Sequence, residues 1–337
     1  MSDVVRVGVV GLGFMGQTHV AAYQSADGVT LVAVADADEA RRTGHASAGG
    51  NLDSGASSDR LFDPAAVRGY ATAEELFAND DVDLVSICTP TPSHVDLAAA
   101  AMRAGKHVLV EKPIAVDTRQ IERLAGIAAE TKRYCMPAMC MRFWPGWTWL
   151  RDTIADKSLG QLRSLSLQRI GARPGWNGFY ADTSQSGGAL VDLHVHDSDF
   201  VHFCLGRPAG VTSVGHVDAV TTMYHYDDAD LRVVAEGAWH HEGTDFRMRY
   251  VADFDAGTAD FDIARDEPLQ LARGGALTPV DLPAGNGYDG EIRHMVQAVA
   301  EGQSPDVTLA DAIATHRLLD AERDSLERRV RVDLPRL

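Results

Sequence analysis

A glycine-rich turn between an apolar strand and a helix constrains the fold of this chain more than any other feature. A β-branched run over residues 4–10 leads directly into Gly11-Leu12-Gly13-Phe14-Met15-Gly16, and residues 15–26 then have a helical composition. In such a unit the first glycine permits the tight turn, the second lets the backbone approach a pyrophosphate, and the third lets helix and strand pack closely. The helix N-terminus faces the anion. The pattern predicts a dinucleotide-binding loop formed by Gly11, Gly13, Phe14, Met15 and Gly16.

An acidic residue at the end of the next apolar segment indicates which dinucleotide is bound. Asp36 follows Gly16 by 20 residues, a position from which a carboxylate can accept hydrogen bonds from the adenosine ribose hydroxyls. The same carboxylate would repel a 2′-phosphate, so the sequence predicts NAD rather than NADP as the cofactor. Arg41 and Arg42 leave NADP open as an alternative, because their side chains could turn toward a 2′-phosphate.

The order of strand-like and helical segments predicts two domains of different class. Further apolar runs that read as strands, with helical stretches between them, lie at residues 31–36, 82–88 and 106–110. This alternation is typical of a doubly wound parallel sheet. From Leu162 onward strands follow one another without helices, many with the polar and apolar alternation of a mostly antiparallel sheet, and helices at 289–301 and 309–328 close the chain. We expect an α/β domain over residues 1–130 and an α+β domain with a large sheet over residues 131–337.

Charge and cysteine content narrow the classes of partner and compartment. The chain has 337 residues with 31 Lys and Arg against 48 Asp and Glu, a net charge of −17, so neither nucleic acid nor a membrane surface is expected as a partner. The four cysteines form no CxxC pair, and no apolar run reaches the ~18 residues that span a bilayer. We expect a cytoplasmic protein. The acidity hints at a cationic amino-sugar substrate, although a generally acidic surface explains it equally well.

A lysine is expected at the edge of the sheet where doubly wound folds hold their ligands. Glu111-Lys112-Pro113 ends the fourth predicted strand, at the carboxyl edge of the sheet. An ammonium beside a nicotinamide can donate to a substrate oxygen and stabilise developing alkoxide charge, and Pro113 would fix the turn that directs it. An ordinary surface lysine is the alternative interpretation.

The densest polar cluster of the chain, residues 187–199, allows three interpretations. As the start of a helix, it places Asp192 and His196 four residues apart on one face, where a carboxylate and an imidazole can converge for acid-base chemistry. As a strand end, it places His194 and His196 on one face, like the HxH metal pair of barrel hydrolases. As a purely structural helix, its His and Asp residues would only cap and hydrate it.

Together, GLGFMG, Asp36, the EKP segment and GGALVDLHVHDSD resemble, over nearly the whole chain, the glucose-fructose oxidoreductase, inositol dehydrogenase and rhizopine-catabolism (Gfo/Idh/MocA) family. The resemblance implies a Rossmann domain followed by a mostly antiparallel sheet domain. It also implies an NAD(P)-dependent enzyme that acts on a sugar, an inositol or a derivative of these, and a homodimer or homotetramer. The expected substrate partner is therefore a small polyol or sugar.

The resemblance also assigns roles to individual residues. It implies that His196 takes the hydroxyl proton as general base while Lys112 and Asp192 hold that hydroxyl, and that hydride passes to the nicotinamide. The cofactor neighbours that it adds to the glycine-rich loop and Asp36 are Thr89, Pro90, His94, Glu111 and Lys112. The residues expected at the substrate are Arg142, Arg169, Trp176, His194 and Tyr288.

Two alternative activities remain open at this point, and the sequence departs from the family pattern in two places. One alternative is a glycoside-cleaving or sugar-coupling enzyme that recycles its NAD internally. The other is a metal-dependent hydrolase built on the HxH motif, although we expect no metal. The departures are His194, where a glycine or threonine is frequent, and a Ser/Gly/Asp-rich insertion at about 47–60.

Overall fold

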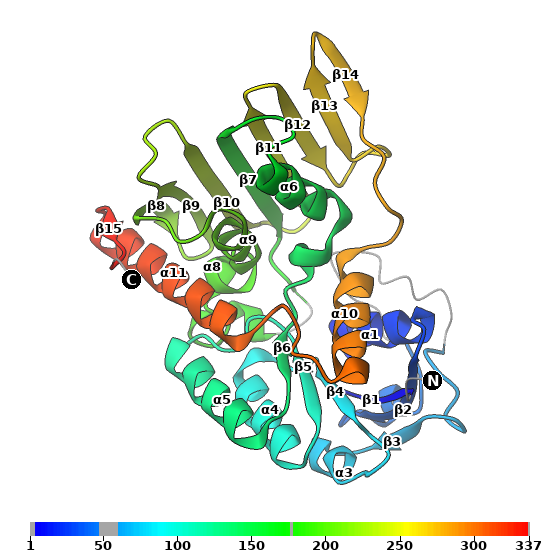
Figure 1. Cartoon of the computed structure of the whole chain (residues 1–337). Coiled ribbons are helices and arrows are strands. Elements are labelled where there is room, and N and C mark those ends of the chain that lie inside the picture. The colour runs from blue at the N-terminus through cyan, green and yellow to red at the C-terminus, as the bar shows by residue number, and fades with distance from the viewer. Residues whose placement is uncertain (1–3, 47–59, 176–177, 336–337) are drawn as a thin grey trace. The chain divides into compact units, whose positions relative to one another are not determined.

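The computed structural model describes residues 4–46, 60–175 and 178–335, which belong to two compact units (Figure 1). The first unit comprises Met1–Cys140 and Asn286–Ile313, and the second comprises Met141–Gly285 and Ala314–Leu337. These bounds differ from the division at residue 130 expected from the sequence, chiefly because the segment 286–313 returns to the first unit. The insertion at 47–60 lies, except for Arg60, outside the described residues.

The first unit is built on a six-stranded sheet with the order β3-β2-β1-β4-β5-β6, in which every neighbouring pair is parallel. The strands are β1 (Val5–Val10), β2 (Val29–Ala35), β3 (Arg68–Tyr70), β4 (Leu84–Ile87), β5 (His107–Val110) and β6 (Cys135–Pro137). The strand order reverses between β1 and β4, which is where doubly wound sheets bind ligands beyond the carboxyl ends of their strands. The predicted doubly wound parallel sheet is confirmed.

Helices cover both faces of this sheet. They are α1 (Phe14–Ser25), α2 (Glu39–Arg42), α3 (Ala73–Phe77), α4 (His94–Arg103), α5 (Thr118–Thr131) and α10 (Gly287–Glu301), with a 3₁₀ turn η1 (Thr91–Ser93). Helices α3, α4 and α5 pack together as one layer, whereas α10 packs on α1 and β1 (Figure 1). The amphipathic α5 shows why: Ile121, Leu124 and Ile127 recur every three residues and are buried on one face.

The second unit is built on a nine-stranded sheet with the order β14-β13-β12-β11-β7-β10-β9-β8-β15. The strands are β7 (Leu162–Ala172), β8 (Gly210–His216), β9 (Ala219–His225), β10 (Arg232–His240), β11 (Arg247–Phe254), β12 (Gly257–Asp262), β13 (Leu269–Arg273), β14 (Ala276–Pro279) and β15 (Val332–Asp333). The central pair, β7 and β10, is parallel and the other pairs are antiparallel. The mostly antiparallel sheet predicted for this part of the chain is confirmed.

One face of this sheet forms the core of the second unit. The helices are α6 (Pro145–Asp156), α7 (Thr183–Ser186), α8 (Gly188–Asp192), α9 (Val195–Leu205) and α11 (Leu309–Arg328), the last shared with the first unit, and the 3₁₀ turns are η2 (Cys140–Phe143) and η3 (Gly178–Ala181). Trp147 of α6 makes edge-on contacts with Phe200 of α9 and Tyr250 of β11, at centroid distances of 4.7 and 5.5 Å. These aromatic contacts hold α6 and α9 on the sheet.

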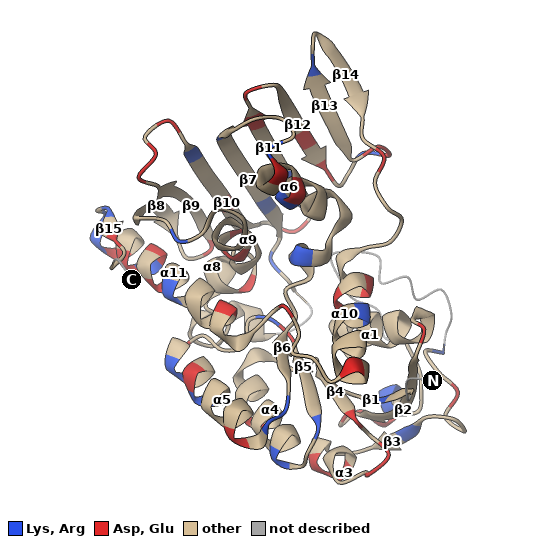
Figure 2. Cartoon of the chain, in the orientation of Figure 1, with Lys and Arg blue, Asp and Glu red and all other residues tan. Residues whose placement is uncertain are grey.

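The distribution of charged residues and the hydropathy of the helices can both be followed along the described residues. Figure 2 shows acidic and basic residues distributed over the helices and strands of both units. Among the helices in the described part of the chain, none is long and apolar enough to cross a bilayer.

The close approach of α6 to β12 generates a prediction about packing. A Cβ on Gly146 would lie 2.4 Å from Cε2 of Phe261, so Gly146→Ala is expected to lower the free energy of unfolding by about 1–3 kcal/mol. The matched control is Gly126→Ala on α5, where a Cβ meets nothing within 4 Å and helix propensity gains up to about 1 kcal/mol. Urea denaturation measures both changes, and equal shifts for the two variants would contradict the prediction.

Candidate functional site

The glycine-rich loop connects β1 to α1 with the backbone geometry that its motif requires. Gly11 has a φ of +84°, and a Cβ there would lie 2.9 Å from the carbonyl oxygen of Cys88. A Cβ on Gly16 would lie 1.9 Å from the carbonyl oxygen of Gly11, so only glycine allows α1 to start this close to the turn. A Cβ on Gly13 would meet no described atom within 4 Å. The first and third glycines thus form the turn, and the second faces open space beside Phe14 and Met15 at the helix N-terminus.

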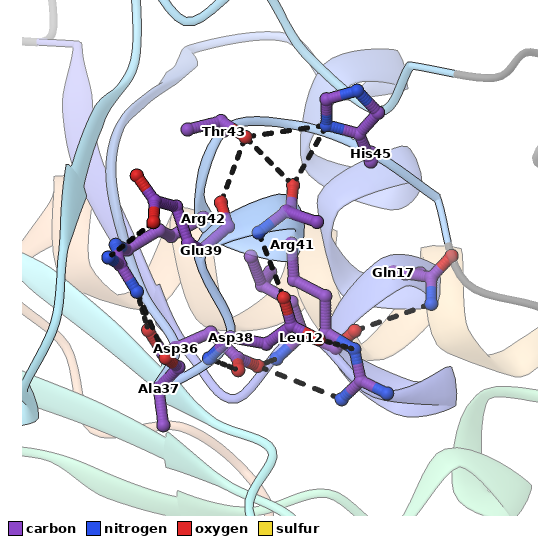
Figure 3. Close-up of polar contacts among 11 residues, drawn as sticks. Leu12, Gln17, Asp36, Ala37, Asp38, Glu39, Arg41, Arg42, Thr43 and His45 are labelled. Carbon is purple, nitrogen blue, oxygen red and sulfur yellow. Dashed lines mark hydrogen bonds and ion pairs between the residues drawn. The ribbon is translucent and has the colours of Figure 1, made fainter.

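Asp36 is held rigidly at the end of β2, as Figure 3 shows. Its carboxylate accepts hydrogen bonds from the backbone N–H of Leu12 at 2.7 Å and from that of Asp38 at 2.9 Å. Nη1 of Arg41 lies 4.0 Å from Oδ2 of Asp36, while Arg42 donates to the carbonyl oxygen of Ala37 at 2.9 Å. Both arginines therefore interact with the turn that carries Asp36 itself.

Lys112 is the second residue after β5 (His107–Val110), and its backbone is held on both sides. Glu111 is buried, with Oε1 at 3.0 Å from Nε2 of His19 and Oε2 accepting the Lys112 backbone N–H at 3.0 Å. On the other side, the imidazole of His94 lies 2.9 Å from the carbonyl oxygen of Pro113 and 2.6 Å from that of Thr89. The loop after β4 and the loop after β5 are thus joined through one buried histidine.

The other residues predicted around the cofactor lie in these same loops. The Thr89 hydroxyl is 2.7 Å from that of Ser93, and Pro90 precedes the turn η1 that leads into α4. Burial lowers the pKa of His94 more than the facing carbonyl oxygens of Thr89 and Pro113 raise it. His94 thus acts from inside the unit, on the backbone of both loops.

Sequence reasoning missed His19, the buried partner of Glu111. A sequence signal was available, because His19 and Tyr23 are polar aromatic residues four apart in the helix that follows the glycine-rich turn, and so share one helix face. Among the described residues, one group of three has the close spacing of a metal-binding cluster, with ligand atoms of His19, Glu111 and Glu291 within 4.8 Å of one another. The 3.0 Å between Nε2 of His19 and Oε1 of Glu111 is the distance of a direct hydrogen bond between these two side chains.

In the second unit, residues 187–199, for which the sequence allowed three interpretations, are mostly helical. Asp192 ends α8, His194 occupies the junction, and His196 lies in the first turn of α9. The strand interpretation was wrong: His194 and His196 do not share a strand face, and the HxH metal pair that it required is absent from this described segment. The segment is also not one continuous helix, because α8 ends at Asp192 and α9 begins at Val195.

His194 is fully buried and has an acidic partner. Its Nε2 lies 3.0 Å from Oε2 of Glu322 on α11 and 3.3 Å from the hydroxyl of Tyr224. Burial opposes charge on the ring, but the charge and hydrogen bond of Glu322 raise the pKa of His194 above its ordinary value. A Cβ on Gly237 would lie 2.7 Å from that of His194, so the ring packs directly on β10.

Two buried arginine–aspartate pairs follow His196 within the first turns of α9. Arg169 of β7 donates to both oxygens of Asp197 at 3.1 and 3.0 Å, and Arg142 of η2 donates to both oxygens of Asp199 at 2.8 and 2.7 Å. The Thr315 hydroxyl donates to Asp199 as well, at 2.9 Å. Because bidentate pairs fix orientation as well as distance, α9 is anchored directly after the imidazole that was predicted to act as base.

The remaining predicted site residues are less informative. Tyr288 is the second residue of α10 and is half-buried, whereas Trp176 lies outside the described residues. Arg142, Arg169 and His194 have the acidic partners described above, and their contact with a substrate stays a prediction.

The chain belongs to the GFO/IDH/MocA family. A family model described as "Oxidoreductase family, NAD-binding Rossmann fold" matches residues 5–139, and the GFO/IDH/MocA C-terminal domain matches residues 147–259. The first unit therefore contains an NAD-binding Rossmann domain, and the protein is an NAD-dependent oxidoreductase.

Individual relatives are similar along the whole chain or a large part of it. Inositol 2-dehydrogenase of Rhizobium meliloti is 27% identical over 94% of this chain and 95% of its own length. UDP-N-acetylglucosamine 3-dehydrogenase of Acidithiobacillus ferrooxidans is 30% identical over 67% of this chain and 61% of its own length. The solved complex of levoglucosan dehydrogenase with NADH and levoglucosan has a TM-score of 0.81 at 22% identity, covering 98% of this chain and 100% of that one.

The open space at Gly13 generates a prediction about cofactor binding. Gly13→Ala is expected to leave the thermal unfolding midpoint unchanged but to weaken NAD binding by about tenfold or more, because the methyl group enters the space through which a pyrophosphate approaches the backbone. Gly16→Ala is the matched comparison and is expected to lose stability as well, because its Cβ would overlap the carbonyl oxygen of Gly11. Calorimetric titration with NAD measures the affinities, and full affinity in the Gly13→Ala variant would contradict the prediction.

Proposed function

We propose that this protein oxidises a secondary hydroxyl of a sugar, inositol, glycoside or amino-sugar to a ketone. The observation that carries the proposal is Lys112, fixed at the carboxyl end of β5 in an NAD-binding Rossmann domain. The similarity to inositol 2-dehydrogenase, UDP-N-acetylglucosamine 3-dehydrogenase and levoglucosan dehydrogenase supports a substrate of this class.

The proposed mechanism divides the work among three residues. The imidazole of His196 accepts the hydroxyl proton as general base, which requires a neutral ring before the reaction. Lys112 donates a hydrogen bond to the same oxygen and stabilises the negative charge that develops on it, and Asp192 orients the hydroxyl. NAD, when bound, accepts the hydride from the carbon that becomes the ketone. In the reductive direction His196 returns the proton.

The charge distribution favours an uncharged substrate within this class. A nucleotide sugar or sugar phosphate would need cationic side chains for its phosphates. Arg142 and Arg169 are each neutralised by an aspartate, and Arg173 pairs with Asp218. The net charge of −17 is spread over both units in Figure 2, so the acidity singles out no aminated substrate. A neutral polyol or sugar is therefore the first substrate to test, and oligomeric state and a cytoplasmic location stay predictions.

The proposed mechanism predicts which variants lose activity. Purified protein with NAD and a panel of sugars, inositols, glycosides and aminoglycosides is expected to reduce the cofactor with one substrate group. Lys112→Met and His196→Gln are each expected to lower kcat by about 100-fold or more, since they remove the hydrogen-bond donor that stabilises the developing charge and the general base, respectively. The NAD dissociation constant of the His196→Gln variant is expected to change little.

Absorbance of the reduced nicotinamide checks this prediction, and Lys157→Met on the exposed loop after α6 serves as the control. Full activity in the His196→Gln variant would contradict the assignment of the base. Consumption of substrate without accumulation of reduced cofactor would instead indicate an enzyme that recycles NAD internally.

The rigid carboxylate of Asp36 predicts the cofactor preference. Asp36→Ala is expected to raise the ratio of kcat/KM for NADP to that for NAD by about tenfold or more, because removal of the carboxylate ends its repulsion of a 2′-phosphate and leaves Arg41 beside the site. Asp38→Ala is the matched control, because Asp38 caps α2 through the Ala40 N–H instead. An unchanged ratio in the Asp36→Ala variant would contradict the prediction.

A further inference from the structure

A buried polar cluster lies behind Lys112 and takes no part in the mechanism above. Its members come from α1, β4, the residue after β5, and α10, and they are His19, Tyr23, Ser86, Glu111 and Glu291. The Ser86 hydroxyl lies 3.1 Å from Nδ1 of His19 and 2.7 Å from the hydroxyl of Tyr23. With the His19–Glu111 contact at 3.0 Å, these hydrogen bonds form a continuous chain from α1 to the residue before Lys112.

Glu291 differs from the other members of the cluster because neither of its carboxyl oxygens has a hydrogen-bond partner. Its side chain is 0% exposed, and its nearest imidazole nitrogen, Nε2 of His19, is 3.9 Å away and already paired with Glu111. An ionised carboxylate without a donor is strongly unfavourable in such surroundings. Burial raises the pKa of Glu291 well above its ordinary value, and the charge of Glu111 raises it further.

Glu111 has the opposite surroundings, although it is nearly as buried. Burial acts to raise its pKa, but the hydrogen bond and charge of His19, followed by the charges of Lys112 and His94, bring it below the ordinary value. Its second oxygen accepts the Lys112 backbone N–H at 3.0 Å, and its own N–H donates to the carbonyl oxygen of Ile87 at 3.0 Å. The two carboxyl groups are therefore driven to different protonation states by their neighbours.

We propose that Glu111 is a positioning residue for Lys112, with its negative charge held by His19, and that Glu291 stays protonated so that no second charge competes for that imidazole. The ionised Glu111 thereby joins the Lys112 backbone to α1. This role for Glu111 rests on the proposed function of Lys112, whereas the protonation of Glu291 does not.

The protonation of Glu291 is tested by stability against pH, without any assay of activity. When folding raises the pKa of an acid, the folded state loses stability as the pH rises from the acid's ordinary pKa toward its raised pKa. For Glu291 the ordinary pKa is 4.5. Glu291→Gln mimics the protonated side chain and removes this loss. The urea midpoint of the Glu291→Gln variant, relative to wild type, is expected to rise steadily from about pH 5 to pH 8.

The comparison between variant and wild type isolates Glu291 from its titratable neighbours. Those that face it or Glu111 are His19, Tyr23, Cys88, His94 and Lys112, and all are retained in the variant. Glu301→Gln, an exposed position on the same helix, is the matched control and is expected to show no slope. A pH-independent difference for Glu291→Gln would overturn the assignment, as would a bound metal ion that this variant loses.

The positioning role of Glu111 is tested by comparing the effect of a substitution on kcat with its effect on the NAD dissociation constant. Glu111→Ala is expected to lower kcat by about tenfold to 100-fold, because Lys112 is then less well oriented, with the NAD dissociation constant within about threefold of wild type. Glu111→Gln keeps an acceptor for the Lys112 N–H and is expected to restore part of kcat. Wild-type kcat in a folded Glu111→Ala variant would overturn the role, as would equal losses in kcat and NAD affinity. If none of the substrates in the panel allows the wild-type protein to reduce NAD, the proposed function fails. The pH experiment still decides whether Glu291 is protonated.

Discussion

The pairing of buried charged side chains is the constraint on which the segments that carry Lys112 and His196 both depend. A carboxylate removed from water costs several kcal/mol unless a cation or several hydrogen bonds compensate it, and loss of one partner of a buried pair typically costs about 3–5 kcal/mol. This chain buries Glu111 with His19, Asp197 with Arg169, Asp199 with Arg142, and Glu322 with His194. Each pair joins elements that are distant in the sequence, so the pairs fix where the loop after β5 and the start of α9 can lie within their own unit.

The two units use this constraint in the same way. In the first, Lys112 follows Glu111, whose side chain turns inward to α1; in the second, His196 precedes Asp197, whose side chain turns inward to β7. The residue proposed to meet the substrate thus has a neighbour that is bound to the interior. A loop residue without such a neighbour would sample many orientations, and catalysis depends on holding reacting groups within a narrow range of geometry.

Local patterns allowed much of the fold to be predicted, and long-range partners account for what was missed. The glycine-rich turn, the alternation of strands and helices, and the later run of strands are short-range signals, and the structure confirms the sheets that they predicted. The ion pairs are not local: Arg169 and Asp197 are 28 residues apart, and Arg142 and Asp199 are 57 apart. His194 was therefore predicted at the substrate, with a metal pair as an alternative, because its partner Glu322 lies on the last helix and gave no local signal. The return of residues 286–313 to the first unit carried no sequence signal either.

That return has a consequence for how the chain is made. Once residues 1–140 have left the ribosome, all six strands of the parallel sheet exist, but α10, which packs on α1 and β1, does not. The Rossmann unit then lacks the helix that packs on α1 while eight of the nine strands of the second sheet, β7–β14, are synthesised. Nascent chains of this length expose apolar surface and unpaired strand edges that promote misassembly. The late helix thus makes completion of the Rossmann unit one of the last events of biosynthesis.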